Sequence, residues 1–230
     1  MQAIAQSDLV SFPALPPDGM YRIDLQYASP DNLLFGEVIY DRPGLPSTVW
    51  LHQTLAKVIT RAAATLKEAG YRLIIFDGLR TVTSQERMLN TAKVHQHPQW
   101  IQEPRLLSPP GKGGHPRGMA VDISIEKRIE NVKGEDRYVA VDMGTPFDFL
   151  AENSQPASNP AHRDYPCTPT VRENRNILDQ HMKEAAIVCG VDLLPLPQEW
   201  WDYRLPPAQY ESYRPLSDAD VPPEARQCKP

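Results

Sequence analysis

Four polar residues in two short segments of this sequence are of the types that bind and use a divalent metal ion. His115 and Asp122 lie in GGHPRGMAVDISI, and Glu199 and Asp202 lie in QEWWDYR near the C-terminus. Imidazole and carboxylate groups both ligate zinc, and a catalytic zinc site combines three protein ligands with an open water position and a nearby general base. One histidine, two aspartates and one glutamate would supply that set. Taken alone, His115 and Asp122 would more often form a hydrogen-bonded structural pair than a metal site.

Arg80 is a further candidate because it ends the segment YRLIIFDGLR, where a predicted strand gives way to a loop. A guanidinium fixed there could stabilise a developing oxyanion. A salt bridge to Asp77 or to another surface acid is the alternative. Of the adjacent tryptophans, Trp200 and Trp201, we expect one to cover the core and the other, Trp201, to line a pocket for a small apolar side chain.

Apolar periodicity predicts the elements that position these residues. Helical spacing predicts helices over 48–69, 83–95 (with Thr83 as N-cap) and 170–190. Strands are predicted over 71–80, 118–126 and 138–144, with loops over 96–114 and 151–170. In the second strand, Val121, Ile123 and Ile125 should face the core, while Asp122 should point the other way. This order of elements predicts an α+β fold: a single domain with a central, mainly antiparallel sheet flanked by helices and long loops.

The bulk properties narrow the class of protein. A net charge of −5 gives no reason to expect a nucleic-acid partner. No segment approaches the roughly 18 apolar residues of a membrane span, and the first residues lack the pattern of a secretory signal. The three cysteines lack metal-type spacing, which favours free thiols in a reducing compartment. We therefore expect a cytoplasmic location, with the periplasm left open.

Taken in order, the motifs of this chain resemble those of the D-alanyl-D-alanine dipeptidases. These are zinc enzymes of vancomycin resistance and cell-wall recycling in the wider D-Ala-D-Ala carboxypeptidase superfamily. The family motif D-x-x-Y-A-T-x-D-N-F is echoed by Asp24, Tyr27, Ala28, Asp31 and Asn32. The motifs D-G-Y-R-P, S-x-H-x-x-G-x-A-x-D, D-M-G-T-x-F-D and E-W-W-H-[YF] correspond to DGLRT at 77–81, GGHPRGMAVD at 113–122, DMGTPFD at 142–148 and EWWDY at 199–203. The resemblance runs from about residue 20 to about residue 210.

The resemblance implies roles for individual residues. His115 and Asp122 would be metal ligands, Glu199 the general base that activates a metal-bound water, and Arg80 a substrate-binding residue that steadies the transition state. Asp142 would face the substrate. The implied reaction is hydrolysis of D-alanyl-D-alanine or a related short dipeptide with one Zn²⁺ per chain. Without the resemblance, DMGTPFDF suggests a strand-to-turn segment with Asp148 as a helix cap.

Asp202 stands where the family has its third metal ligand, a histidine. In our first interpretation Asp202 itself binds the metal, giving a His-Asp-Asp site that binds zinc more weakly and shifts preference toward Mn²⁺, Co²⁺ or Fe²⁺. With two carboxylates the zinc site would be formally neutral, which predicts a more alkaline pH optimum. In the second, the metal is lost and the protein binds ligands without hydrolysis. In the third, another histidine replaces the missing one, for which the candidates are His52, His162 and His181.

Other departures from the family motifs concern specificity. Leu79, Thr81 and Gly113 replace a tyrosine, a proline and a serine, which suits relaxed or redirected substrate binding. A carboxypeptidase acting on peptidoglycan stem peptides is therefore an alternative activity, and the loops at 96–114 and 151–170 are candidates for walls that limit substrate length. We expect an N-terminal arm over 1–20, a metallopeptidase domain over 21–210 and a C-terminal tail over 211–230, with a small dipeptide as the partner and a homodimer left open.

Overall fold

A six-stranded sheet forms the centre of the protein and carries the residues of interest. The computed structural model describes all residues except 15, 17, 43–47, 104, 130–136 and 230. Along the sheet the strand order is β2-β4-β5-β8-β7, and β6 also pairs with β5. The strands are β2 (Tyr21–Ile23), β4 (Tyr71–Asp77), β5 (Ala120–Ile129), β6 (Arg137–Ala140), β7 (Leu194–Pro195) and β8 (Asp202–Arg204). Only the β2–β4 pair is parallel among the described strands, which confirms the mainly antiparallel α+β fold.

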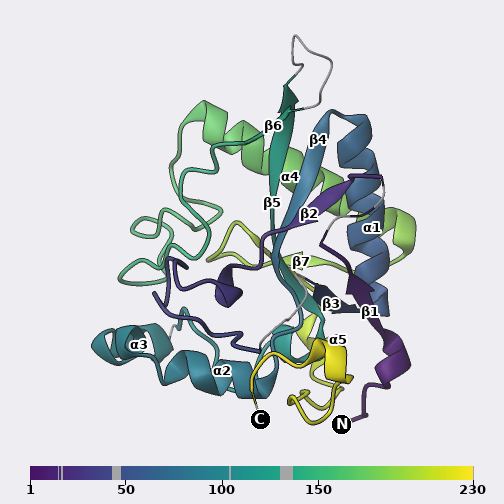
Figure 1. Cartoon of the computed structure of the whole chain (residues 1–230). Helices are drawn as coiled ribbons and strands as arrows, with labels where there is room; N and C mark the ends of the chain where they lie inside the picture. The colour runs from purple at the N-terminus through teal and green to yellow at the C-terminus, as the bar shows by residue number, and fades with distance from the viewer. Residues whose placement is uncertain (15, 17, 43–47, 104, 130–136, 230) are drawn as a thin grey trace.

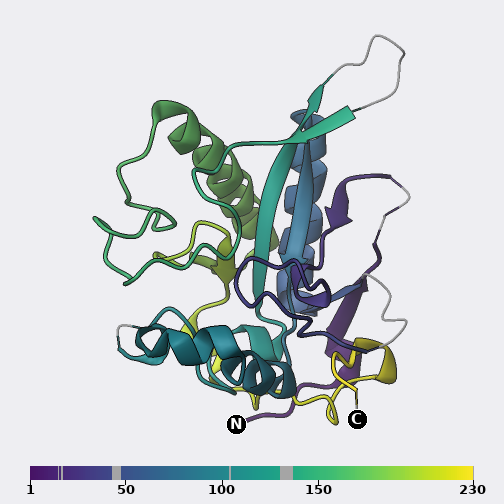
Figure 2. The same cartoon turned by 60° about the vertical axis from the view of Figure 1, so that its left-hand side comes forward.

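Two long helices, α1 (Gln53–Glu68) and α4 (Pro169–Cys189), pack against each other beside the sheet (Figure 1). The short helices α2 (Val82–Leu89), α3 (Ala92–Gln96) and α5 (Pro207–Tyr210) lie toward the end of the molecule where both chain termini are found (Figures 1 and 2). Single 3-10 turns make up the remaining helical elements: Gln6–Asp8, Gln26–Ala28, Pro98–Ile101, His115–Arg117 and Pro223–Ala225. None of the helices in the described ranges is both long and apolar enough to cross a membrane.

The predicted helix over 48–69 begins later than expected, because its first residues form a strand. β3 (Val49–His52) pairs antiparallel with β1 (Leu9–Phe12), and α1 starts only at Gln53, where the side chain of His52 accepts a hydrogen bond from the backbone N–H of Thr54. The valine, tryptophan and leucine of this segment suit a half-buried strand as well as a helix face. Pairing with β1 decides between the two.

The helix predicted over 83–95 is broken into α2 and α3, and its N-cap is Thr81 rather than Thr83. The Thr81 hydroxyl accepts the backbone N–H of Ser84, and the Thr91 hydroxyl caps α3 by accepting the N–H of Val94. The β-hydroxyl of Thr91 thus starts a new helix inside a continuous apolar pattern. The helix predicted over 170–190 is confirmed and ends at Gly190, whose φ is +64°.

The segments that flank the predicted domain are packed onto it. β1 joins the first residues of the chain to β3, and Gln227 near the C-terminus accepts hydrogen bonds from the Thr81 N–H and the Ser84 hydroxyl. The boundaries at 20/21 and 210/211 stay predictions. All three cysteines are free thiols, as expected from their spacing.

Candidate metal and active site

His115 is brought to the sheet by a tight turn between two glycines. The 3-10 turn His115–Arg117 ends at Gly118, whose φ of +63° is the left-handed conformation that suits glycine. A Cβ on Gly118 would lie 2.8 Å from the backbone nitrogen of His52, and one on Gly114 would lie 2.8 Å from the carbonyl oxygen of Met119. The glycines therefore allow the chain to pass close to its neighbours.

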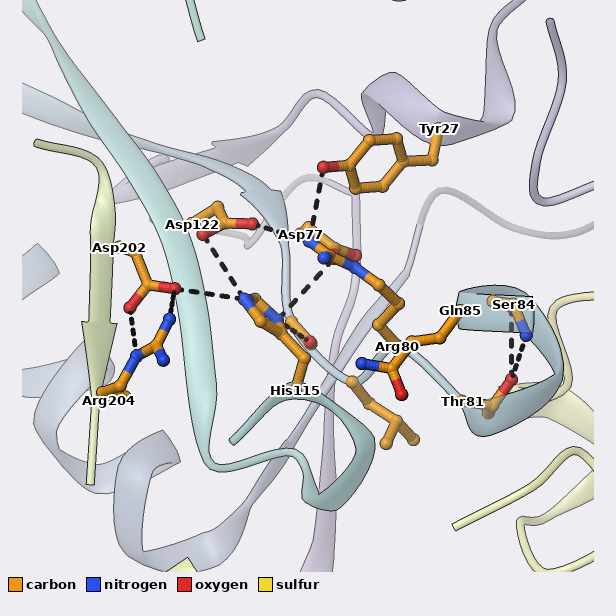
Figure 3. Close-up of polar contacts among 12 residues, drawn as sticks. Tyr27, Asp77, Arg80, Thr81, Ser84, Gln85, His115, Asp122, Asp202 and Arg204 are labelled. Carbon is orange, nitrogen blue, oxygen red and sulfur yellow. Dashed lines mark hydrogen bonds and ion pairs between the residues drawn. The ribbon is translucent and has the colours of Figure 1, made fainter. Parts of the chain in front are cut away.

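The orientation of the His115 ring follows from one backbone contact. Nδ1 lies 2.7 Å from the carbonyl oxygen of Gly78, and because a carbonyl only accepts, Nδ1 carries the proton of this bond. In the neutral ring Nε2 then keeps its lone pair, which points at Asp122 and Asp202 (Figure 3). A backbone acceptor on the far nitrogen is the usual support of a metal-ligating histidine.

Three aspartates form a row across neighbouring strands. Asp122 of β5 is paired with Asp77 of β4, beside a shift in register, and with Asp202 of β8. Residues paired directly across strands present their side chains on the same face. Nε2 of His115 lies 3.5 Å from Oδ1 of Asp122 and 3.3 Å from Oδ2 of Asp202. The three predicted metal ligands thus converge.

Asp122 is buried, whereas an alternating pattern usually indicates a strand with one face exposed to solvent. Val121, Ile123 and Ile125 lie in the core as predicted, but Asp122 is also only 1% exposed. The face that carries it is covered by the His115 turn and by the side chains of the site. Its Oδ2 accepts a hydrogen bond from Arg80 at 3.0 Å, whereas Oδ1 receives no hydrogen bond in the described structure.

Arg80 combines the two arrangements considered from the sequence: it forms the salt bridge to Asp77, and it also lies in the candidate site. Its Nε donates to Oδ2 of Asp77 at 2.8 Å, so the salt bridge to Asp77 exists. One terminal nitrogen also reaches Oδ2 of Asp122 and the hydroxyl of Tyr27, at 3.0 and 3.3 Å, and the side chain lines the same cavity as His115. A guanidinium held by several partners is a rigid positive charge beside the candidate ligands (Figure 3).

Glu199 lies next to the two aspartates in the turn that precedes β8. Carboxylate oxygens of Glu199, Asp122 and Asp202 all lie within 4.8 Å of one another. Burial, followed by the charges of Asp202 and Asp122, raises the pKa of Glu199 to about 8. The predicted general base is therefore partly buried at the edge of the candidate metal site.

Arg204, which motif matching did not find, holds Asp202 in a two-pronged ion pair. Its Nε donates to Oδ1 at 2.7 Å, and a terminal nitrogen donates to Oδ2. Burial would raise the pKa of Asp202, but the charges of Arg204 and His115 outweigh it and lower the pKa. The signal was available in the sequence, because residues two apart on a strand share a face.

Asp77, Asp122 and Asp202 all face His115 at the position where the candidate ligands meet. Burial and the charge of Arg80 oppose protonation of His115, yet Asp122 and Asp202 raise its pKa to about 10. A group that holds a proton this tightly between two carboxylates marks a site of negative potential. Two overlapping groups of potential ligands, Asp77 with His115 and Asp122 and then Asp122 with Glu199 and Asp202, have ligand atoms within 4.8 Å of one another. Together with the unpartnered Oδ1 of Asp122, these donors fit a divalent metal ion beside Asp122.

A cavity of about 170 Å³ opens onto this cluster. Trp201 forms part of its wall, while Trp200 packs edge-to-face on Trp201 and donates its indole N–H to the Thr145 hydroxyl at 2.8 Å. Both tryptophans are buried, and of the two only Trp201 lines the cavity. Contact of Trp201 with a substrate stays a prediction. Of the two loops considered as walls, residues from 105–113 line the cavity, whereas no described residue of 151–170 does.

Several candidates lie away from the cavity. Asp142 borders a separate surface pocket with Gly144 and Tyr165, and its carboxylate accepts the backbone N–H of Gly144. The position of Asp142 thus does not support direct contact with a substrate at the metal cluster. The alternative ligand histidines also lie elsewhere: His52 caps α1, His162 accepts the N–H of Asp164 and His181 contacts the Thr65 hydroxyl.

The helix cap expected at Asp148 is wrong, because Asp148 caps none of the helices in the described residues. It has a φ of 59°, is 6% exposed and accepts a hydrogen bond from the hydroxyl of Tyr27 at 3.0 Å. Burial, followed by the charge of Asp122, raises its pKa to about 8. Asp148 and Tyr27 both line the cavity, and each lies within a motif recognised in the sequence.

The geometry defines a metal-dependent hydrolase type of site: a convergent His-Asp-Asp set, an adjacent carboxyl group and a fixed arginine. The model of the peptidase M15 family, described as D-ala-D-ala dipeptidase, matches residues 6–219, and the chain belongs to this family. The family comprises metallopeptidases acting on D-Ala-containing peptides.

Comparison with solved structures finds an L-Ala D-Glu endopeptidase, ChiX, from Serratia marcescens. It is 14% identical, with a TM-score of 0.34, over 70% of this chain and 84% of that chain. Comparison with curated proteins finds no match.

Proposed function

We propose that the protein is a metal-dependent dipeptidase that hydrolyses D-alanyl-D-alanine or a related short dipeptide. The observation that carries the proposal is the convergence of His115 Nε2, Asp122 Oδ1 and Asp202 Oδ2, with Glu199 beside them. Membership of the M15 family supports peptide hydrolysis as the reaction class. The cavity at this cluster and the loop residues that line it suit a short substrate.

His115, Asp122 and Asp202 would hold the metal ion, with Zn²⁺ as first choice and Mn²⁺, Co²⁺ or Fe²⁺ compatible with the carboxylate-rich set. Bound there, the ion would act as a Lewis acid on the scissile carbonyl and supply an activated water. Each proposed ligand atom is available in a different way. Oδ1 of Asp122 receives no hydrogen bond, whereas Nε2 of His115 must first release the proton that it shares with Asp122 and Asp202, and Oδ2 of Asp202 is shared with Arg204.

Glu199 would move the protons of the reaction. Its carboxylate accepts a proton from the attacking water and returns it to the departing amine. In the metal-free protein, burial and the charges of Asp202 and Asp122 raise the pKa of Glu199 to about 8. A bound cation would neutralise part of that charge and favour the ionised carboxylate, the form that accepts a proton.

Arg80 and Trp201 would position the substrate. Arg80 is held by Asp77 and Asp122, so its guanidinium needs no reorganisation to meet negative charge that develops on the carbonyl oxygen. Trp201 offers an apolar surface in the same cavity, suited to a methyl side chain.

The deciding experiment is release of D-alanine from D-alanyl-D-alanine after metal removal and re-addition of Zn²⁺, Mn²⁺, Co²⁺ or Fe²⁺. We expect release that depends on metal and is lost in Glu199→Ala. Release that persists in the chelated protein or in Glu199→Ala would contradict the proposal. A pentapeptide stem assayed alongside separates the dipeptidase from the carboxypeptidase, because only the latter should cleave it at a comparable rate.

A second candidate is a ligand-binding protein without hydrolysis. One observation favours it: the carboxylate of Asp202 is already paired with the guanidinium of Arg204. A binding protein would take up the dipeptide with no release of D-alanine under any metal. Equilibrium binding of D-alanyl-D-alanine, measured beside the release assay, distinguishes the two.

A further inference from the structure

We propose that Arg204 is an internal counter-ion that competes with the metal for Asp202 and thereby weakens metal binding at this site. The inference rests on the proposed function, since it concerns the same His115, Asp122 and Asp202 set. It assigns to Arg204 a role in metal loading.

The contacts of Arg204 carry the first step. Both oxygens of Asp202 accept from the guanidinium, and one of them, Oδ2, is the oxygen that faces His115 Nε2 at 3.3 Å. The side chain of Asp202 is only 1% exposed and that of Arg204 is 15% exposed. A two-pronged pair shielded from water in this way is among the stronger ion pairs in proteins (Figure 3). A metal ion that bound Oδ2 would meet a carboxylate whose charge is already compensated.

The backbone holds the pair in place. Asp202 and Arg204 lie at the two ends of β8, and because side chains alternate along a strand, both project to the same face. β8 is in turn fixed between β5 and β7, with Asp202 opposite Asp122 and Arg204 opposite Ala120. Arg204 also lines the cavity from which the metal would enter. Its charge therefore opposes a second cation even if one hydrogen bond to Asp202 opens.

The pair also stabilises the protein when no metal is bound. A buried carboxylate without a partner is strongly destabilising, and metal sites without such a partner tend to fold only with their metal. Arg204, together with His115 at 3.3 Å from Oδ2, removes that penalty for Asp202. We therefore infer a metal-free state that stays folded and loads metal reversibly, with an affinity set by the competition.

The test compares Arg204→Gln with wild type. Arg214→Gln serves as the matched control, because Arg214 is an exposed arginine, also paired with an aspartate, Asp220. Zn²⁺ and Mn²⁺ affinities are measured by competition with a chromogenic chelator at constant pH. We expect Arg204→Gln to bind each metal at least tenfold more tightly than wild type and Arg214→Gln to match wild type. Unchanged or weaker binding by Arg204→Gln would overturn the proposal.

Thermal unfolding provides a second readout that does not depend on activity. Without metal, Arg204→Gln should melt below wild type, and saturating Zn²⁺ should raise its Tm by more than that of wild type, because tighter binding stabilises the folded state more. An equal or smaller shift contradicts the competition. If Arg204→Gln does not fold, Arg204→Lys replaces it in both assays. Its loss of the two-pronged contact should still tighten metal binding, but by less than Arg204→Gln, because lysine keeps the positive charge.

The outcomes separate this inference from the proposed function. If wild type releases D-alanine in a metal-dependent way and Arg204→Gln gains no metal affinity, only the role of Arg204 is contradicted. If wild type, Arg204→Gln and Arg204→Lys all fold but bind no metal, both the role of Arg204 and the proposed function are contradicted. Asp202→Asn identifies the site, since it should weaken metal binding; unchanged affinity would overturn the proposal.

Discussion

Substitution of Glu199 by glutamine should remove hydrolysis and stabilise the metal-free protein at high pH. The pKa of Glu199 is raised from 4.5 to about 8 by burial and by the charges of Asp202 and Asp122. The folded protein therefore binds this proton more tightly than the unfolded chain does. The free energy of unfolding of wild type falls as pH rises from about 4.5 to about 8, and the full penalty is present above that range.

Glutamine has nearly the same shape and cannot ionise, so the variant escapes this penalty. At about 1.4 kcal/mol per pKa unit, the shift of Glu199 sets a ceiling of about 5 kcal/mol. Because Glu199 is only partly buried, solvent screening reduces the expected gain to about 1–3 kcal/mol above pH 8. Loss of the proton-transfer group should lower kcat by about 10²–10⁴.

Denaturant unfolding in the presence of a chelator measures the first effect, and D-alanine release with metal measures the second. The stability difference between Glu199→Gln and wild type should be near zero below pH 4.5 and should grow as pH rises toward 8. Glu211→Gln is the control, because Glu211 is an exposed acid that is not among the residues lining the cavity. A stability difference that does not change with pH would refute the electrostatic reasoning, and retained activity would refute the assignment of the base.

Three further substitutions test how the site is positioned. Gly118→Ala should destabilise by at least about 1–2 kcal/mol, because alanine disfavours a φ of +63° and its Cβ would meet the backbone of His52; denaturant midpoints measure this. Thr81→Ala should cost about 1–2 kcal/mol in the same assay by removing the N-cap of α2. Tyr27→Phe removes the hydroxyl that donates a hydrogen bond to Asp148 and should lower the free energy of unfolding by about 1–3 kcal/mol. The loss should be larger above pH 8 than at pH 5, because the pKa of Asp148 is about 8 and only its ionised carboxylate accepts a strong hydrogen bond.

The sequence predicted the candidate ligands but not how they meet. Alternation along β5 indicated that Asp122 points away from Val121 and Ile123, although all three residues are buried. The pairing of Asp122 with Asp77 and Asp202 depends on strand register, which joins residues up to 80 positions apart. Periodicity within one strand contains no information about its partner, so the row of aspartates could not be read from the sequence.

The mistakes about individual elements have local causes. The segment Val49–His52 satisfied a helical pattern, and only the presence of β1 made it a strand. The N-cap of α2 is Thr81 and not the predicted Thr83, because a buried hydrogen-bond network with Asp218 and Gln227 fixes Thr81. Both outcomes depend on segments distant in the sequence, one near each terminus. Tertiary pairing, rather than local propensity, decided them.

Arg204 changes the electrostatic argument about the aspartate that replaces the family histidine. With Asp202 considered alone, a site of one histidine and two aspartates leaves a divalent ion formally neutralised, which predicted a more alkaline pH optimum. The structure adds a guanidinium bound to both oxygens of Asp202, so the pair of Asp202 and Arg204 carries the same net charge as a neutral histidine. The reason to expect an alkaline pH optimum is therefore weakened, whereas the reason to expect weak metal binding is strengthened. The aspartate at position 202 thus acts together with Arg204 on β8, and its effect on the metal site depends on both residues.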